Sequence, residues 1–116
     1  MLFRSMAFNP EALRRVSELA PRQRTALLVA ARHIEEAGVR PEAAIAWARR
    51  AGATDAGLQF MLVDHAVVRA ARGAGVRLGV WTVNDEATMR WLVVLGVDLI
   101  TSDRPDLLQL VLGSTS

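Results

Sequence analysis

Aromatic and polar residues that could contact a ligand stand where two apolar runs end near the C-terminus. Trp81-Thr82-Val83-Asn84 ends the first run, and Ser102-Asp103-Arg104 follows the second. The flat face of Trp81 could pack on a small organic molecule, and Asn84 could orient that molecule or a bound water. Arg104 could reach a phosphate oxygen, because a guanidinium matches the geometry of phosphate. The pattern therefore offers binding contacts rather than a catalytic set.

Each of these residues also has a purely structural interpretation. Trp81 could simply pack in the core, and so could Phe8, which ends the first apolar run of the chain. Asn84 or Asp85 fits the N-cap of the helix that follows, and Asp103 fits the N-cap of the last helix. Both interpretations stay open for the four candidate binding residues, Phe8, Trp81, Asn84 and Arg104.

Other groups capable of chemistry do not form a recognisable set. His33 and His65 are expected to be exposed or to lie on helix surfaces. Glu35 and Glu36 are adjacent, and adjacent residues of a helix point to different faces, so we expect a solvated surface there. The chain has no cysteine, no nucleophile elbow and no glycine-rich phosphate loop. The sequence therefore assigns no catalytic residue and no metal ligand.

Short apolar runs alternate with alanine-rich helical segments along the chain. Runs that are apolar on both faces, such as residues 26–30, are typical of a parallel sheet that is buried on both sides. Gly75-Val76-Arg77-Leu78 and Gly96-Val97-Asp98-Leu99 repeat one pattern, a helix stop followed by a strand. We therefore predict five parallel strands, over residues 2–8, 25–30, 56–60, 77–83 and 98–101, with helices between them.

The fold class that follows is α/β, a partial (β/α) barrel. A complete barrel of this kind needs roughly 200 residues or more, and the chain has 116. Residues 31–38 are ambiguous, because they fit either a helical turn closed by Gly38 or an extension of the preceding loop. The sequence contains no linker-like tract. We therefore expect one domain over residues 1–112 and a frayed tail over 113–116.

Composition and charge exclude several classes of protein. The chain is 52% hydrophobic, which argues against disorder, and its net charge is only +2. All 14 basic residues are arginines, scattered over helices and balanced by 12 acids, so we expect no nucleic-acid partner. No run approaches the roughly 18 apolar residues that span a bilayer, and no export signal is evident, which favours a cytoplasmic protein without a membrane span.

The strand ends resemble those of the glycerophosphodiester phosphodiesterase family. Its members typically show Ser-Phe-(Asp/Asn)-Pro, then Trp-Thr-Val-Asn, then Thr-Asp-x-Pro-Asp. The first motif appears here in the loosened form Ser5-Met-Ala-Phe8-Asn9-Pro10, and the second is intact at residues 81–84. The third appears as Ser102-Asp103-Arg104-Pro105-Asp106, after Gly96-Val97-Asp98. The order of the motifs also matches, and the similarity covers essentially the whole chain.

This resemblance implies the last five strands of a (β/α)8 barrel. The complete family enzyme hydrolyses glycerophosphodiesters to an alcohol and glycerol phosphate, with a divalent cation, calcium or magnesium. The resemblance places Phe8, Trp81, Asn84 and Arg104 at the barrel mouth, facing the glycerophosphodiester substrate. The family's His-Arg-Gly and Glu-x-Asp motifs, which hold the metal, do not occur in this sequence. We therefore expect the isolated chain to bind no metal and to be inactive.

Half a barrel leaves its inward side chains and two sheet edges uncovered. The cover could be a second copy in a homo-oligomer, which we expect, or a missing N-terminal half. Two alternatives to a phosphodiesterase fragment remain. One is a non-catalytic half-barrel that acts as a binding or assembly module. The other is a different (β/α) protein with similar strand ends, such as a phosphate-binding module.

Overall fold

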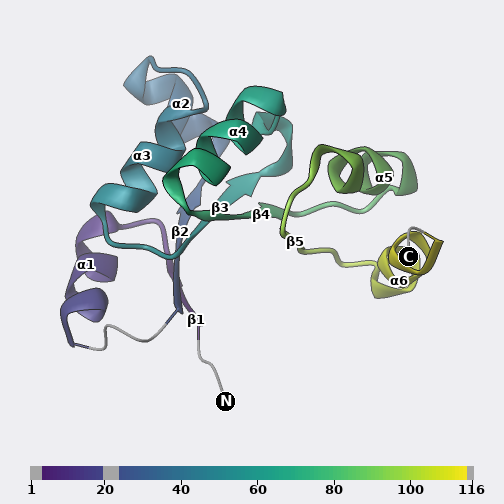
Figure 1. Ribbon diagram of the computed structural model, residues 1–116, viewed down its shortest axis with the longest axis horizontal. Helices are drawn as coiled ribbons and strands as arrows, with labels where there is room; N and C mark the ends of the chain where they lie inside the picture. Colours follow the sequence, from purple (N-terminus) through teal and green to yellow (C-terminus); the bar gives the residue numbers. More distant parts are fainter. Residues whose placement is uncertain (1–3, 20–23, 115–116) are drawn as a thin grey trace.

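The computed structural model describes residues 4–19 and 24–114, which form one sheet with helices along one side of it (Figure 1). Five parallel strands lie in the order β1-β2-β3-β4-β5, so each strand pairs with its neighbour in sequence. The strands are β1 (Arg4–Ala7), β2 (Arg24–Val29), β3 (Asp55–Gln59), β4 (Arg77–Trp81) and β5 (Leu99–Ile100). The helices are α1 (Pro10–Leu19), α2 (Ala31–Ala37), α3 (Ala43–Arg50), α4 (His65–Ala74), α5 (Glu86–Leu95) and α6 (Pro105–Ser114), with a short 3-10 turn η1 (Phe60–Leu62). This is the predicted α/β alternation of a partial barrel.

The elements differ from the predicted ones mainly at their ends. Residues 31–38, which the sequence left ambiguous, form helix α2, closed by Gly38 in the left-handed region at a φ of 66°. Strand β4 stops at Trp81, two residues earlier than predicted, and β5 keeps only Leu99 and Ile100. The last helix extends to Ser114 and includes two residues expected to be frayed; residues 115–116 lie outside the described part.

The two faces of the sheet are very different. One face packs under the helices, where Leu27, Leu58, Leu78 and Val80 are at most 2% exposed. The opposite face would line the interior of a barrel, and its residues on the central strands include Gly57 and Gly79. The helices follow the outer side of the row of strands, from α1 beside β1 to α6 beyond β5 (Figure 1). The molecule is therefore a sheet with one covered face and one face that no helix covers.

Local signals at the helix ends explain why the strands are so regularly placed. Asp64 caps α4 by accepting a hydrogen bond from the Val67 backbone at 3.0 Å, and Asp85 caps α5 in the same way. Gly75 and Gly96 end these helices in the left-handed region, at φ angles of 69° and 98°. Other residues are strained there, so the two glycines fix where the next strands begin. The repeated Gly-Val junction predicted from the sequence is confirmed.

One ion pair lies on the uncovered face, at the amino ends of β2 and β3. Arg24 Nη2 lies 2.7 Å from Asp55 Oδ1, and the Asp55 side chain is only 2% exposed. In the register of β3 and β4, Arg77 stands opposite Asp55, so its side chain belongs to the same face of the sheet.

Within the described residues, no helix is both long enough and apolar enough to cross a membrane.

Leu58 lies at the centre of the covered face, and its truncation tests this assignment of the core. We expect Leu58→Ala to lower the free energy of unfolding by about 2–5 kcal/mol, because the buried side chain leaves a cavity. Urea unfolding followed by circular dichroism measures the loss. Leu19→Ala is the matched control, since Leu19 is 87% exposed and should change stability little. Equal losses for the two variants would contradict this core.

Candidate functional site at the carboxyl edge of the sheet

Two of the predicted site residues, Phe8 and Trp81, meet at the carboxyl edge of the sheet. Phe8 follows β1 and Trp81 ends β4, and parallel strands bring their carboxyl ends to one side of the sheet. The ring centroids lie 6.1 Å apart with the planes at 85°, an edge-to-face contact. Phe8 is 46% exposed and Trp81 is half-buried. The edge therefore carries an aromatic pair that is open to solvent.

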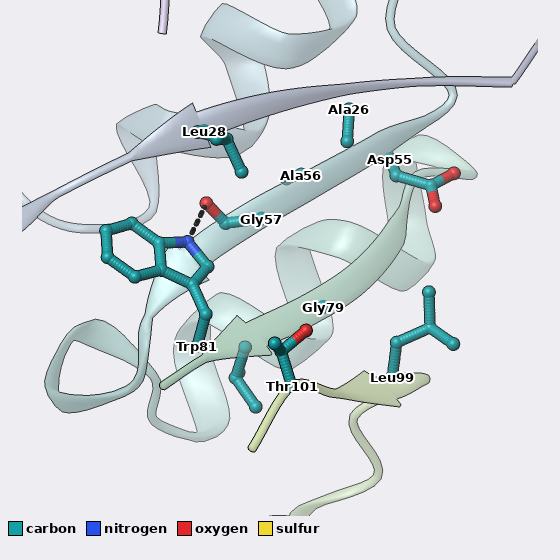
Figure 2. A pocket seen from close by; sticks show the side chains of 10 residues that line it. Ala26, Leu28, Asp55, Ala56, Gly57, Gly79, Trp81, Leu99 and Thr101 are labelled. Atoms are coloured by element: carbon teal, nitrogen blue, oxygen red, sulfur yellow. Dashed lines mark hydrogen bonds between the residues drawn. The ribbon is translucent and has the colours of Figure 1, made fainter. Parts of the chain in front are cut away.

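The indole of Trp81 is held in place by the neighbouring strand (Figure 2). Its Nε1 donates a hydrogen bond to the Gly57 carbonyl oxygen at 2.8 Å, so the ring lies across β3 on the uncovered face. A Cβ on Gly57 would come within 2.8 Å of Leu28 Cδ2 and 3.8 Å of the indole. A side chain at this position would push the end of Leu28 aside, so glycine lets Leu28 lie close over β3. Trp81 packs on the sheet and is half-buried, and its role in binding stays a prediction.

The uncovered face beside Trp81 contains a cavity of about 30 Å³ (Figure 2). Gly57, Gly79, Leu99 and Thr101 line it together with Asp55 at its far end. This volume has room for a water molecule or two, and it is far smaller than a ligand pocket of the usual several hundred Å³. A substrate that contacts Trp81 would therefore lie above the edge of the strands and not inside this cavity.

Asn84 joins two loops at the same edge. Its Oδ1 accepts hydrogen bonds from the Asp103 backbone at 2.8 Å and from Ser102 Oγ at 3.2 Å. Its Nδ2 donates to Asp103 Oδ2 at 3.3 Å. The loop after β4 is thereby tied to the loop after β5. Both polar atoms of the amide are engaged within the protein, and Asp85, not Asn84, caps the helix.

Arg104 stands apart from the aromatic pair, at the start of α6. Its guanidinium makes two hydrogen bonds to Asp106, at 2.9 and 3.1 Å. These bonds raise the pKa of Arg104 and lower the pKa of Asp106. Both side chains are exposed, so the pair is weak and a phosphate could compete for the guanidinium.

Two residues at this edge were missed by the sequence analysis. His33, expected to be exposed or to lie on a helix surface, lies on α2 and is half-buried, with its ring centroid 5.4 Å from that of Phe8. Gln59, at the end of β3, accepts a hydrogen bond from the Ala31 backbone at 2.8 Å. The available signal was their place near the carboxyl ends of predicted strands: His33 comes three residues after the strand 25–30, and Gln59 is the last residue but one of the strand 56–60. His65 is exposed, as expected.

The donor groups of this edge do not fit a divalent metal ion. Among residues 4–19 and 24–114, no three His, Asp or Glu side chains lie close enough together to hold one. The nearby carboxylates of Asp85 and Asp106 are already bonded, to Thr88 and Arg104 respectively. A hard cation needs several oxygen ligands around one point, and this edge does not gather them.

A match to a known family defines the class of this protein. The pattern of the Glycerophosphoryl diester phosphodiesterase family matches residues 3–107. The chain therefore belongs to this family, whose members generally use a divalent metal ion and act on glycerophosphodiesters. A search of curated proteins gave no match.

Solved structures show the same fold over part of their length. A glycerophosphoryl diester phosphodiesterase assigned in Silicibacter pomeroyi DSS-3 is 24% identical with a TM-score of 0.80, covering 95% of this chain and 37% of that protein. A glycerophosphodiester phosphodiesterase from Parabacteroides distasonis is 24% identical with a TM-score of 0.75, covering 95% and 42%. An Oleispira antarctica phosphodiesterase, solved with the product sn-glycerol-3-phosphate, is 21% identical with a TM-score of 0.76, covering 97% and 42%. The chain spans less than half the length of each.

Asp85 gives a test of the helix cap that positions the Trp81 loop. Hydrogen bonds from the Thr88 backbone and hydroxyl lower the pKa of Asp85 below its ordinary value. The ionised carboxylate therefore stabilises the fold above the ordinary pKa of an aspartate, and this contribution is lost as the pH falls through the lowered pKa. Asp85→Asn keeps a capping oxygen but cannot ionise.

We expect the stability of Asp85→Asn to fall less on acidification than that of the unaltered chain. Urea unfolding near neutral pH and at about one pH unit below the ordinary aspartate pKa measures the difference. The two proteins share every other ionisable group, so the effects of those groups cancel. An identical pH dependence for the two proteins would show that the Asp85 cap does not contribute.

Proposed function

We propose that this chain is the C-terminal part of a glycerophosphodiester phosphodiesterase and supplies the wall of the site that faces the glycerol part of the substrate. The observation that carries this proposal is the Phe8–Trp81 pair, placed at the carboxyl edge of the sheet in a member of this family. Catalytic and binding residues of (β/α) barrels stand at this edge. The two rings offer apolar surface to the carbon atoms of a glycerol.

The roles of the other candidates follow from their contacts. Asn84 would act by fixing the loop that follows Trp81 against the Ser102–Asp103 turn, since its amide is already bonded there. Arg104 would contact a phosphate by exchanging its bonds to Asp106. The complete enzyme would hydrolyse the diester with calcium or magnesium, releasing an alcohol and glycerol phosphate. The residues that hold such an ion would come from outside this chain, which we propose is inactive alone.

Binding and turnover are tested on the same purified chain. We expect sn-glycerol 3-phosphate to shift the indole and ring signals of Trp81 and Phe8 in NMR spectra. We expect no hydrolysis of glycerophosphocholine, with or without calcium or magnesium, because the metal ligands are lacking. Trp91 is the internal control, since its half-exposed indole lies on α5 and should not respond to the ligand.

Either result can contradict the proposal. If the signals of Trp81 and Phe8 do not move at saturating sn-glycerol 3-phosphate, they do not form a substrate wall. Metal-dependent turnover by the isolated chain would mean that it assembles a catalytic site of its own.

A second candidate function is that of an assembly module without catalysis. The observation in its favour is exposed apolar surface on the last two helices, where Trp91, Val94, Leu110 and Leu112 are 47–82% exposed. Next to it, a hollow of about 260 Å³ lies between these helices and β5, lined mainly by Val93, Val97, Leu99, Ile100 and Leu108. Apolar patches of this kind usually mark contact surfaces. A second copy or an N-terminal half of the barrel could cover it.

Val94 tests whether this surface joins two copies. We expect sedimentation of the unaltered chain at micromolar concentration to show a dimer or a larger oligomer, and Val94→Asp to shift it toward monomer. Val94 is 82% exposed, so the change should not unfold the chain. Val39→Asp is the control, since Val39 is exposed but lies beyond the end of α2. A monomeric unaltered chain would rule out self-association through this surface.

A further inference from the structure

His33 has one ring nitrogen in use and one available. Nδ1 accepts a hydrogen bond from the Ala30 backbone at 2.9 Å, at the start of α2. Nδ1 therefore carries no hydrogen, and the neutral ring has its hydrogen on Nε2. Within the described part of the chain, the His33 ring makes no other hydrogen bond. The Nε2–H group is thus a hydrogen-bond donor of fixed tautomer.

The surroundings of His33 are apolar. The ring lines a hollow of about 170 Å³ together with Phe8, Pro10, Trp47 and three residues of β2, Leu27, Leu28 and Val29. Besides the His33 ring, this lining has one other polar side-chain group, the indole N–H of Trp47. An apolar hollow with a few placed polar groups is the usual composition of a small-molecule subsite.

The hollow adjoins the aromatic wall described above. The Phe8 ring contacts His33 on one side and Trp81 on the other, with centroid distances of 5.4 and 6.1 Å. A substrate whose glycerol packs on Phe8 and Trp81 would therefore extend its other end toward His33. That other end is the alcohol part of the diester.

Charge decides which alcohol fits. Neither a carboxylate nor a guanidinium lines the hollow. A cationic head group would meet no counter-charge there. An ionised acid would be desolvated without a partner in the apolar lining. A neutral N–H donor in such surroundings matches an uncharged hydroxyl oxygen.

We infer that His33 is a substrate-contacting residue whose Nε2–H donates a hydrogen bond to a hydroxyl oxygen of an uncharged alcohol group of the diester. This inference rests on the proposed function, because it needs the glycerol phosphate to lie against Phe8 and Trp81. It assigns the hollow beside Phe8 as the subsite for the alcohol part. It also makes glycerophosphoglycerol a better ligand than glycerophosphocholine.

Two substitutions separate the ligand contact from the helix cap. In His33→Asn, the amide oxygen replaces Nδ1 as acceptor for the Ala30 backbone, but no group replaces Nε2–H. In His33→Gln, the amide nitrogen reaches the place of Nε2, but the acceptor for Ala30 is lost. If His33 only caps the helix, His33→Gln is the variant that loses stability. If His33 contacts the ligand, His33→Asn is the variant that loses affinity.

The measurement is an NMR titration of the full chain with glycerophosphoglycerol and with glycerophosphocholine. For glycerophosphoglycerol we expect His33→Asn to weaken binding by about tenfold, the value of one hydrogen bond, with the melting temperature nearly unchanged. His33→Gln should keep the affinity within about twofold and lower the melting temperature. Binding of glycerophosphocholine should be weaker than that of glycerophosphoglycerol and insensitive to His33→Asn.

Each other outcome overturns the inference in a distinct way. Unchanged affinity of His33→Asn for glycerophosphoglycerol, with Trp81 still responding, removes His33 from the site and leaves the proposed function standing. An equal loss for both diesters places His33 on the shared glycerol phosphate and not on the alcohol. No response of Trp81 to either diester contradicts the proposed function together with the inference.

Discussion

The described helices cover only one face of the sheet, and the rest of the structure follows from this. Parallel sheets are normally buried on both sides. Here the helices cover Leu27, Leu58 and Leu78, whereas the opposite face is closed by its own side chains. The indole of Trp81 and the Leu28 side chain fold over Gly57, and the Arg24–Asp55 pair occupies the other end. The aromatic wall is thus also the part of the chain that covers the open face.

The composition of that face favours one way of completing it. Two copies of a five-stranded sheet would make ten strands and a wider interior than the eight of a (β/α)8 barrel. Gly57 and Gly79 bring no side chain to fill such an interior. Each copy would also bring two arginines, Arg24 and Arg77, and one carboxylate, Asp55, to the shared interior. The positive charges would therefore exceed the negative charges among these residues. We therefore propose that strands with bulky and acidic inward residues complete this face and that self-association uses the exposed side of α5 and α6.

Local signals were sufficient to predict the order of the elements, whereas the contents of the site depend on distant contacts. Asp64, Gly75 and Gly96 act within a few residues of themselves, and the helices end and the strands begin where these residues predict. The end of β4 is different, because it depends on which residues of β3 and β5 lie alongside. The contact between His33 and Phe8 could not be predicted, because no periodic pattern of the sequence connects these two residues.

Polar side chains at the carboxyl edge are mostly occupied by the backbone of the loops. His33, Gln59 and Asn84 accept hydrogen bonds from the amides of Ala30, Ala31 and Asp103, and Asp85 accepts one from Thr88. Loops this short at the end of a parallel sheet leave amides that need acceptors, and unpaired amides are costly once a ligand displaces water. Aromatic faces and the Nε2–H of His33 remain for a ligand. We propose that such an edge holds and orients a substrate, and that the proton transfers of hydrolysis come from residues supplied across the open face.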